Sequence, residues 1–436
     1  MPLAPRWRGE GMFNDALTTS KQHSARRVAW RVAAVGTALA LTLTGCSSGG
    51  GDNSSGNGSK NVKVDEVRLG TILPLTGSTA QNGNNSLHGI ELAVEQINAA
   101  GGIKSMGGAK IKLSTADATS DAAKAASAAT QFLSKGEPPL AIVGAYASGL
   151  TITVARVTER AKVPLLSTGF ADELTHQGYK YFFQLPPASS LMGAAQFNYA
   201  IDIAKDAGKS IDKVAIVYAN NAYGESQAKA LKAQADKAGK TVVLNEGYSP
   251  NITDAGPIVS KIVASKPDAI YSIAYVPDSV LLMRALKAQG SDVPIFGGTG
   301  GYITPDFVKA LGDQVNDVFS ITTSNPDGYG DIGAAYLKKY GEFMPQEAHD
   351  NAAAVYVFAQ ALEEHPTTDS TDLAKYLHEG KFDQGAAASM PGGFVDFDET
   401  GVNVNAKPVM VQWQNKSLIG VWPADIVKGK PVWPGQ

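Results

Sequence analysis

The sequence predicts an α/β fold made of two lobes, each a mainly parallel sheet flanked by helices. Short apolar runs such as residues 140–143 (LAIV) lack polar alternation, which is typical of parallel strands covered on both faces. Amphipathic helices separate these runs at regular intervals. The alternation pauses at Pro186-Pro187 and then starts again, so we expect two sheets and a first crossing between lobes at this point.

The first lobe begins with a strand at 67–73, a polar turn loop and a helix that ends at Gly101-Gly102. A strand from about 111 and an Ala-rich helix ending near 133 come next. The strand at 140–143 leads through a loop to a helix that starts near Ser148 or Thr151, both good N-cap residues. A further strand at 163–166 then ends in a loop of small hydroxyl residues and an aromatic ring.

The second lobe repeats this alternation of strands and helices. Its expected strands are 213–219, 241–245, 269–274 and 293–296, and its expected helices are 190–207, one that opens at 220–224, 253–265 and 277–289. Residues 330–380 read as mainly helical. Residues 392–422 then return to strand-like patterns that close the fold.

The composition and charge of the chain argue against one class of function, nucleic-acid binding. The 436 residues are 44% hydrophobic and 18% charged, which is ordinary for a globular protein with two domains. The formal net charge is −3, and beyond residue 45 there remain 32 basic and 39 acidic side chains, a net charge of −7. An acidic body without a basic stripe argues against nucleic-acid binding.

The N-terminal region predicts export and lipid attachment. Arg26, Arg27 and Arg31 precede an uncharged run at 32–44, which has the length of a signal-peptide core and is too short to span a bilayer. The sequence LTGC then resembles a bacterial lipobox ending at Cys46. We therefore expect a signal peptide at 1–45 and a lipid-modified (palmitate-bearing) Cys46 with a flexible Gly/Ser/Asn tether at 46–61. The alternative is an ordinary secretory signal with an incidental cysteine.

Polar and aromatic residues collect in the loops that follow the predicted strands, where open parallel sheets bind ligands. Hydroxyls and free backbone N–H groups suit a carboxylate, while aromatic rings supply apolar walls. The candidate ligand-binding residues are Gln81, Asn82, Tyr146, Ser148, Thr168, Gly169, Phe170, Tyr223, Tyr275 and Thr299.

Each of these residues also has a plain structural reading. Ser148 could be a helix cap, Tyr275 could pack in the core, and Tyr223 could be an exposed loop aromatic. The Gly-rich loop at 297–301 could be only a turn.

An enzyme is not expected. The chain has no GxSxG, HExxH or Walker sequence, and a single cysteine excludes a Cys-rich metal cluster. We expect His349-Asp350 to be a surface or capping pair rather than a catalytic dyad, and Asp172 and Glu173 to begin an exposed helix. The sequence therefore predicts a binding protein without a metal or cofactor.

Several segments together resemble one family, the extracytoplasmic solute-binding proteins of branched-chain amino-acid ABC importers, which have the type I periplasmic-binding-protein fold. The resemblance extends over about 67–422. The segments that carry it are GTILPLTGSTAQNG (70–83), GIELAVEQINAAGG (89–102), Asp117 before an Ala-rich helix, VGAYAS, LLSTGFADEL, AIVYANNAYGES and GGFVDFDETG.

The resemblance implies three crossovers between the lobes and a hinge that closes on the ligand. By position, lobe 1 would be 62–185 plus 325–391, and lobe 2 would be 188–322 plus 394–436. Ser148 resembles the serine that holds the ligand carboxylate, and residues 168–170 resemble a second strip of ligand contacts. Tyr223 and Tyr275 resemble aromatics that close from lobe 2. A monomer anchored at the extracytoplasmic face, working with an ABC permease and ATPase subunits, is implied as well.

The sequence departs from the family pattern in the loop around Thr299. Amino-acid binders usually have an acidic residue there that pairs with the ligand ammonium, and Phe170 stands where they often have threonine. An amino acid of the hydrophobic or branched-chain kind remains the expected ligand. The alternatives are a carboxylate ligand without an amine, aromatic acids included, and a receptor that signals to a membrane sensor.

Overall fold

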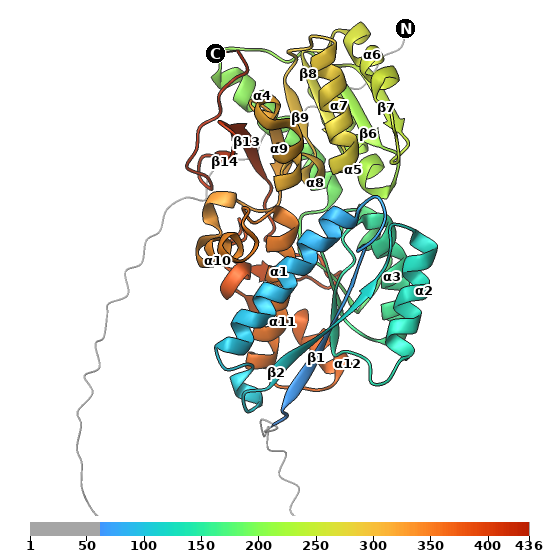
Figure 1. Cartoon of the computed structure of the whole chain (residues 1–436), viewed down its shortest axis with the longest axis vertical. Helices are drawn as coiled ribbons and strands as arrows, with labels where there is room; N and C mark the ends of the chain where they lie inside the picture. Colours follow the sequence, from blue (N-terminus) through green and yellow to red (C-terminus); the bar gives the residue numbers. More distant parts are fainter. Residues whose placement is uncertain (1–61, 436) are drawn as a thin grey trace, which may run out of the picture. The chain divides into compact units, whose positions relative to one another are not determined.

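Two large β-sheets, with a third sheet of two strands, organise residues 62–435, the part of the chain that this computed structural model describes (Figure 1). The predicted signal peptide, the tether and Cys46 lie outside the described residues. Each sheet belongs to one lobe, as the sequence predicts. No helix between residues 62 and 435 has the length and apolar character needed to cross a membrane.

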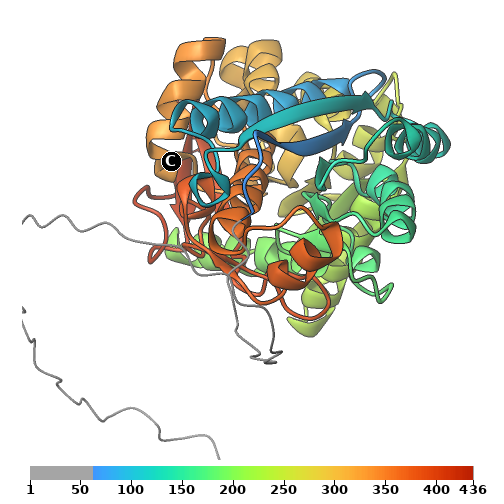
Figure 2. The ribbon, with the colours of Figure 1, turned by 90° about the horizontal axis from the view of Figure 1, so that it is seen from below.

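The first sheet is wholly parallel, with strand order β2-β1-β3-β4-β5. Helix α1 lies along α11, and α2 packs against α3 on the other side of the sheet (Figures 1 and 2). The elements of this lobe are β1 (Glu66–Leu73), α1 (Ala80–Ala99), β2 (Lys110–Asp117), α2 (Ala122–Ser134), β3 (Ala141–Gly144), α3 (Ser148–Ala161), β4 (Leu165–Ser167), β5 (Phe182–Gln184), α10 (Gly330–Tyr340), α11 (Gln346–Glu364), α12 (Ser370–Leu377), β11 (Lys381–Phe382) and β12 (Val395–Asp396).

The second sheet has seven strands in the order β14-β13-β10-β9-β8-β6-β7. Strands β6 to β10 are parallel, and β13 and β14 add an antiparallel edge. The elements of this lobe are α4 (Ser189–Asp206), β6 (Lys213–Ala219), α5 (Ala222–Lys237), β7 (Thr241–Tyr248), α6 (Gly256–Ser265), β8 (Ala269–Ile273), α7 (Val276–Ala288), β9 (Ile295–Gly297), α8 (Thr299–Tyr302), α9 (Pro305–Leu311), β10 (Phe319–Thr322), β13 (Val409–Gln414) and β14 (Ser417–Trp422).

Within the described residues the chain passes between the sheets three times: after β5, after β10 and before β13. The last passage comes later than expected, because residues 394–405 stay with lobe 1 instead of lobe 2. Strand β12 pairs with β11, and the N–H of Asn403 donates to the carbonyl of Gln184 in β5 at 3.0 Å. These backbone pairings keep residues 394–405 with lobe 1, whereas the family resemblance implied that they belong to lobe 2.

A glycine allows α1 and α11 to approach closely. A Cβ at Gly89 would lie 1.9 Å from the carbonyl oxygen of Ala348, so any larger residue would push the helices apart. The helices are therefore in backbone contact beside the N-terminal turn of α11. This contact brings Glu347 against Asn82 and Asn85 of α1, which matters for the site below.

Candidate functional site

The loops at the strand ends of the two lobes meet at one buried boundary. The side-chain amide of Asn82 donates to the carbonyl of Gly300, 3.2 Å away in the other lobe. The rings of Tyr146 and Tyr275 lie 6.5 Å apart between their centroids, and those of Phe170 and Tyr223 lie 5.9 Å apart. Each pair joins one lobe to the other, so aromatic residues of both lobes form one cluster. All four of these aromatic residues are buried.

Small residues in the loop before and within α8 make this approach possible. A Cβ at Gly300 would lie 2.3 Å from the Tyr146 hydroxyl, and a Cβ at Gly298 would lie 2.7 Å from the Tyr223 hydroxyl. Tyr146 itself has φ +67°, a left-handed conformation that is unusual for a residue with a Cβ. Its ring is thus held against lobe 2 by an uncommon backbone geometry. The Gly-rich segment at 297–301 is therefore not only a turn, because its glycines leave room for the tyrosine hydroxyls to approach.

Ser148 does not cap its helix. The N-cap of α3 is Ala147, without a side-chain cap hydrogen bond, so the plain reading of Ser148 as a cap is wrong. The Ser148 hydroxyl oxygen instead accepts the backbone N–H groups of Phe170 and Ala171, both at 3.1 Å. Because both contacts use the oxygen as an acceptor, the hydroxyl proton remains to be donated. Ser148 is 1% exposed, so a partner for this proton would be enclosed.

The neighbouring loop after β4 is also buried. The Thr168 hydroxyl accepts the side-chain amide of Asn351 at 3.3 Å. Gly169 lies so close to α3 that a Cβ would come within 3.0 Å of the Thr151 hydroxyl. This loop therefore has little room to move relative to Ser148.

In lobe 2, Thr299 and Tyr223 form a pair, with their hydroxyl oxygens 3.1 Å apart. Tyr223 is 3% exposed, so it is not an exposed loop aromatic. Gln81 is the predicted site residue that stands apart: it lies exposed on the first turn of α1, whereas Asn82 beside it is buried. Nine of the ten predicted ligand-binding residues are thus buried where the strand-end loops of the lobes meet.

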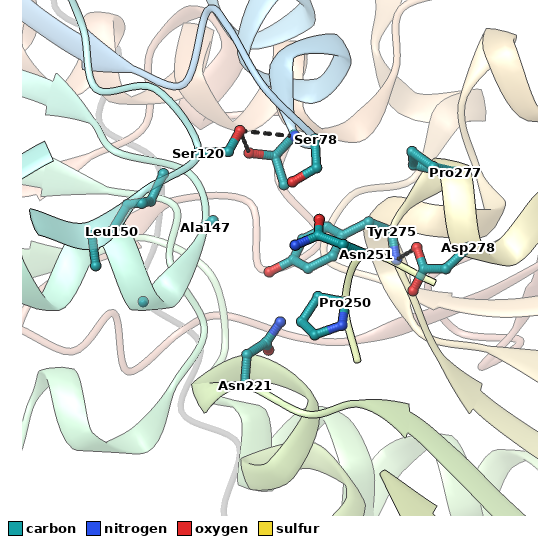
Figure 3. A pocket seen from close by; sticks show the side chains of 13 residues that line it. Ser78, Ser120, Ala147, Leu150, Asn221, Pro250, Asn251, Tyr275, Pro277 and Asp278 are labelled. Atoms are coloured by element: carbon teal, nitrogen blue, oxygen red, sulfur yellow. Dashed lines mark hydrogen bonds between the residues drawn. The ribbon is translucent and has the colours of Figure 1, made fainter. Parts of the chain in front are cut away.

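A pocket of about 200 Å³ opens between the lobes (Figure 3). Ser78, Ser120 and Leu150 line it from lobe 1, and Asn221 and Asn251 face them from lobe 2. Of the predicted ligand-binding residues, only Tyr275 lines this pocket. Tyr275 therefore lies between the open pocket and the buried aromatic cluster, in contact with both.

Two buried carboxylates at this boundary were not anticipated from the sequence. Burial raises the pKa of Glu347 to about 7, although hydrogen bonds from Asn85 and Asn82 oppose the shift. Burial likewise raises the pKa of Asp278 to about 7, against hydrogen bonds from the Tyr248 hydroxyl and from backbone N–H groups including that of Tyr275. The sequence feature that marks Glu347 is the polar run QEAHDN (346–351), which begins the otherwise Ala-rich, apolar α11.

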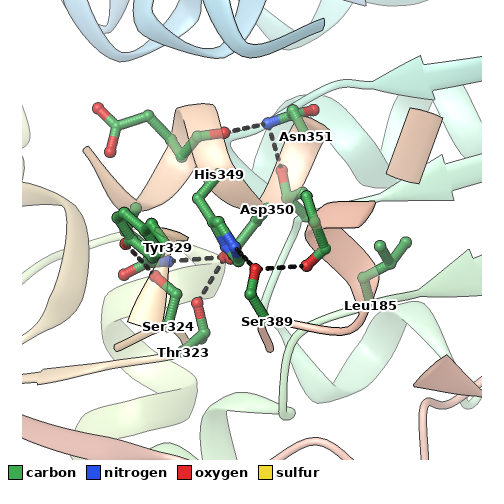
Figure 4. Close-up of polar contacts among 12 residues, drawn as sticks. Leu185, Thr323, Ser324, Tyr329, His349, Asp350, Asn351 and Ser389 are labelled. Carbon is green, nitrogen blue, oxygen red and sulfur yellow. Dashed lines mark hydrogen bonds and ion pairs between the residues drawn. The ribbon is translucent and has the colours of Figure 1, made fainter. Parts of the chain in front are cut away.

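The expectation for His349-Asp350 is wrong, because both side chains are fully buried rather than at the surface. His349 stacks on Tyr329 with ring centroids 4.2 Å apart and lies 2.7 Å from the Ser389 hydroxyl (Figure 4). Asp350 accepts the hydroxyl of Thr323 in the second crossing (Figure 4). Burial follows because α11 is covered on all sides.

The neighbouring side chains of Ser389, His349 and Asp350 have the composition of a catalytic triad but not its geometry. The Nδ1 atom of His349 is 3.5 Å from Asp350, the outer limit of a hydrogen bond. The Asp350 carboxylate already accepts the Gln346 amide and the Thr323 hydroxyl. The group ties a crossing segment to α11 and is structural.

The Asp172 expectation is wrong in part. A short 3₁₀ helix does begin there, but the carboxylate of Asp172 accepts the hydroxyls of Ser190 and of Ser226 in α5. Asp172 is thus partly buried in a polar contact between the lobes.

Two α/β lobes, joined by three crossings and meeting over a buried wall of aromatic and hydroxyl side chains, define a binding protein that can enclose a small molecule. Comparison with known proteins makes the assignment specific. Residues 66–417 match the model of the family described as "Periplasmic binding protein", and this chain belongs to that family. Membership of a family of binding proteins confirms that the chain is not an enzyme.

Among curated proteins, the Leu/Ile/Val-binding protein homolog 8 of Brucella melitensis is 32% identical over 380 residues, covering 84% of this chain and 92% of that protein. Among solved structures, the branched-chain amino acid transporter substrate binding protein LivJ of Streptococcus pneumoniae, in complex with isoleucine, matches with a TM-score of 0.72 at 24% identity. That match covers 81% of this chain and 97% of LivJ. The leucine binding protein LivK of Thermotoga maritima also matches with a TM-score of 0.72, at 23% identity, covering 82% and 99%. These structures confirm the predicted type I fold.

Proposed function

We propose that this protein is the substrate-binding component of an ABC importer and encloses a branched-chain or other hydrophobic amino acid between its lobes. The observation that carries the proposal is the meeting of strand-end loops from both lobes at one buried boundary. The choice of ligand is supported by the names of the similar proteins: a Leu/Ile/Val-binding protein homolog, LivJ in complex with isoleucine, and the leucine binding protein LivK.

The chemistry of the boundary suits such a ligand. Ser148 has a hydroxyl proton left to donate, and a carboxylate oxygen is the acceptor that an amino acid would offer. The rings of Phe170 and Tyr223 give apolar surface for an aliphatic side chain. Ligand binding would stabilise the form in which the lobes touch, and that form would dock on the permease.

The proposal includes a lipid anchor at Cys46 on the extracytoplasmic face of the membrane. The basic flank, the uncharged run at 32–44 and the LTGC sequence support it. In cells that express the full chain, Cys46→Ser should move the protein from the membrane fraction to the soluble extracytoplasmic fraction. Unchanged membrane retention would refute the anchor while leaving the ligand proposal intact.

Titration calorimetry of residues 47–436 tests the ligand. Leucine, isoleucine and valine should bind with one site, and each should raise the melting temperature by mass action. The comparison compounds are 4-methylpentanoate, which is leucine without its amine, and benzoate. Binding of these acids with leucine inert would instead support the alternative of an amine-free carboxylate.

A further inference from the structure

One group of polar side chains at the lobe boundary has hydrogen-bonding capacity left over. Within the described residues, the buried atoms Glu347 Oε2, Asn82 Oδ1 and Asn351 Oδ1 have no hydrogen-bond partner. The three residues are 2%, 1% and 0% exposed. A buried polar atom without a partner costs free energy, so such a set needs an explanation.

These three residues are linked to one another. The amide of Asn82 donates to Glu347 Oε1 at 2.9 Å, and the amide of Asn351 donates to the main-chain oxygen of Glu347 at 2.8 Å (Figure 4 shows the Asn351 amide). Both amide nitrogens are therefore occupied, which fixes the orientation of both side chains. Each of the three residues therefore keeps one side-chain oxygen that accepts no hydrogen bond.

The same residues contact the predicted site in both lobes. Asn351 also donates to Thr168 of lobe 1, and Asn82 also donates to the carbonyl of Gly300 in lobe 2, one residue from Thr299. The carboxyl of Glu347 thus lies beside the loop in which the sequence lacks an acidic residue. No ion pair in the described part of the chain involves Glu347.

We propose that Glu347, with the amide oxygen of Asn82, binds the ammonium group of the ligand. A primary ammonium offers N–H donors and no acceptor, which complements the unpartnered Glu347 Oε2 and Asn82 Oδ1 atoms of two side chains that already contact each other. Glu347 supplies from α11 of lobe 1 the negative charge that Thr299 cannot supply from lobe 2. This inference rests on the proposed function, because it assumes a ligand that carries an amine.

Proton release gives a measurement that a structural role would not affect. The titratable groups around Glu347 are Asp350 on its own helix, Tyr146 after β3, and Tyr329 and Tyr336 from the segment around α10. Because burial raises its pKa to about 7, a substantial fraction of Glu347 is protonated near pH 6.5. A bound ammonium favours the carboxylate form, so the carboxyl should lose its proton on binding.

The test is calorimetry at pH 6.5 in phosphate and in Tris, with wild type, Glu347→Gln and the control Glu364→Gln at the exposed far end of α11. For wild type and the control, leucine binding should show an enthalpy that depends on the buffer, and raising the pH to 8 should tighten binding several-fold. Glu347→Gln should bind leucine at least tenfold more weakly and lose both dependences.

Two further results separate the possible failures. If Glu347→Gln binds leucine with wild-type affinity and the same proton release, the inference is wrong while the proposed function stands. If wild type binds amine-free acids and no amino acid, both are wrong. Should Glu347→Gln fail to fold, wild type alone decides, because leucine should release protons and 4-methylpentanoate should release none.

Discussion

Replacing Gly300 by alanine should prevent the lobes from closing fully. The new Cβ would lie 2.3 Å from the Tyr146 hydroxyl oxygen, whereas ordinary contacts begin at 3.4 Å. The two groups must therefore separate by about 1 Å, and the buried Tyr146 ring has Tyr275 on one side. Overpacking of this kind costs about 1–3 kcal/mol. Because the clash exists only when the lobes touch, we expect affinity for the amino-acid ligand to fall by about 10–100-fold.

The structure also provides a rescue. Without the Tyr146 hydroxyl, the next atom of the ring, Cζ, lies 3.5 Å from the new Cβ, which is an ordinary contact. The double variant Gly300→Ala/Tyr146→Phe should therefore bind more tightly than the two single effects predict, in a double-mutant cycle measured by calorimetry. Gly328→Ala is the control, since its Cβ would meet nothing closer than 3.6 Å. Wild-type affinity of Gly300→Ala, or simple additivity in the cycle, would refute this account of closure.

Two other predictions concern single side chains. Ser148→Ala removes a donor to the ligand and the acceptor of two buried N–H groups, those of Phe170 and Ala171. The binding free energy of the ligand should therefore weaken by about 1–3 kcal/mol, and the melting temperature should drop. Unchanged affinity in calorimetry would place the ligand carboxylate elsewhere. Asp278 has a folded pKa of about 7 against 3.8, so the native state retains a proton that the unfolded chain loses, and stability should fall as pH rises through that interval. Asp278→Asn should flatten part of this slope in urea unfolding at pH 5 and pH 8, and an unaltered slope would contradict the shift.

Local patterns were sufficient for most elements of the fold. The predicted strand at 213–219 coincides with β6 (Lys213–Ala219), because a continuous apolar run between turn residues has few other solutions in a βα repeat. Residues 394–405 show where this reasoning ends. Their strand-like pattern is real, but their partners are β11 and β5, and a sequence pattern does not specify partners.

The site was predictable where its residues follow strands and unpredictable where helix packing brings them in. Tyr146, Phe170, Tyr223 and Tyr275 meet because parallel strands end at one edge of each sheet. Glu347 reaches the boundary only because α11 packs against α1 at Gly89, a contact between residues more than 250 positions apart. Nothing local in the sequence specifies that contact.

The first turns of α11 carry two polar faces. The side chains of one face are fully hydrogen-bonded, whereas those of the other are not. Gln346 and Asp350, four residues apart, accept the hydroxyls of Thr322, at the end of β10, and of Thr323, in the crossing that follows. Glu347 and Asn351, also four residues apart, face the lobe boundary and retain unpartnered acceptors.

A fully bonded network is rigid, whereas an incompletely bonded one gains most from a new donor. We therefore expect the face of α11 that carries Gln346 and Asp350 to remain fixed. A ligand at the face that carries Glu347 would supply the missing hydrogen bonds. Closure would then be stabilised mainly by the ligand, because contacts between the lobes alone leave these acceptors unpaired.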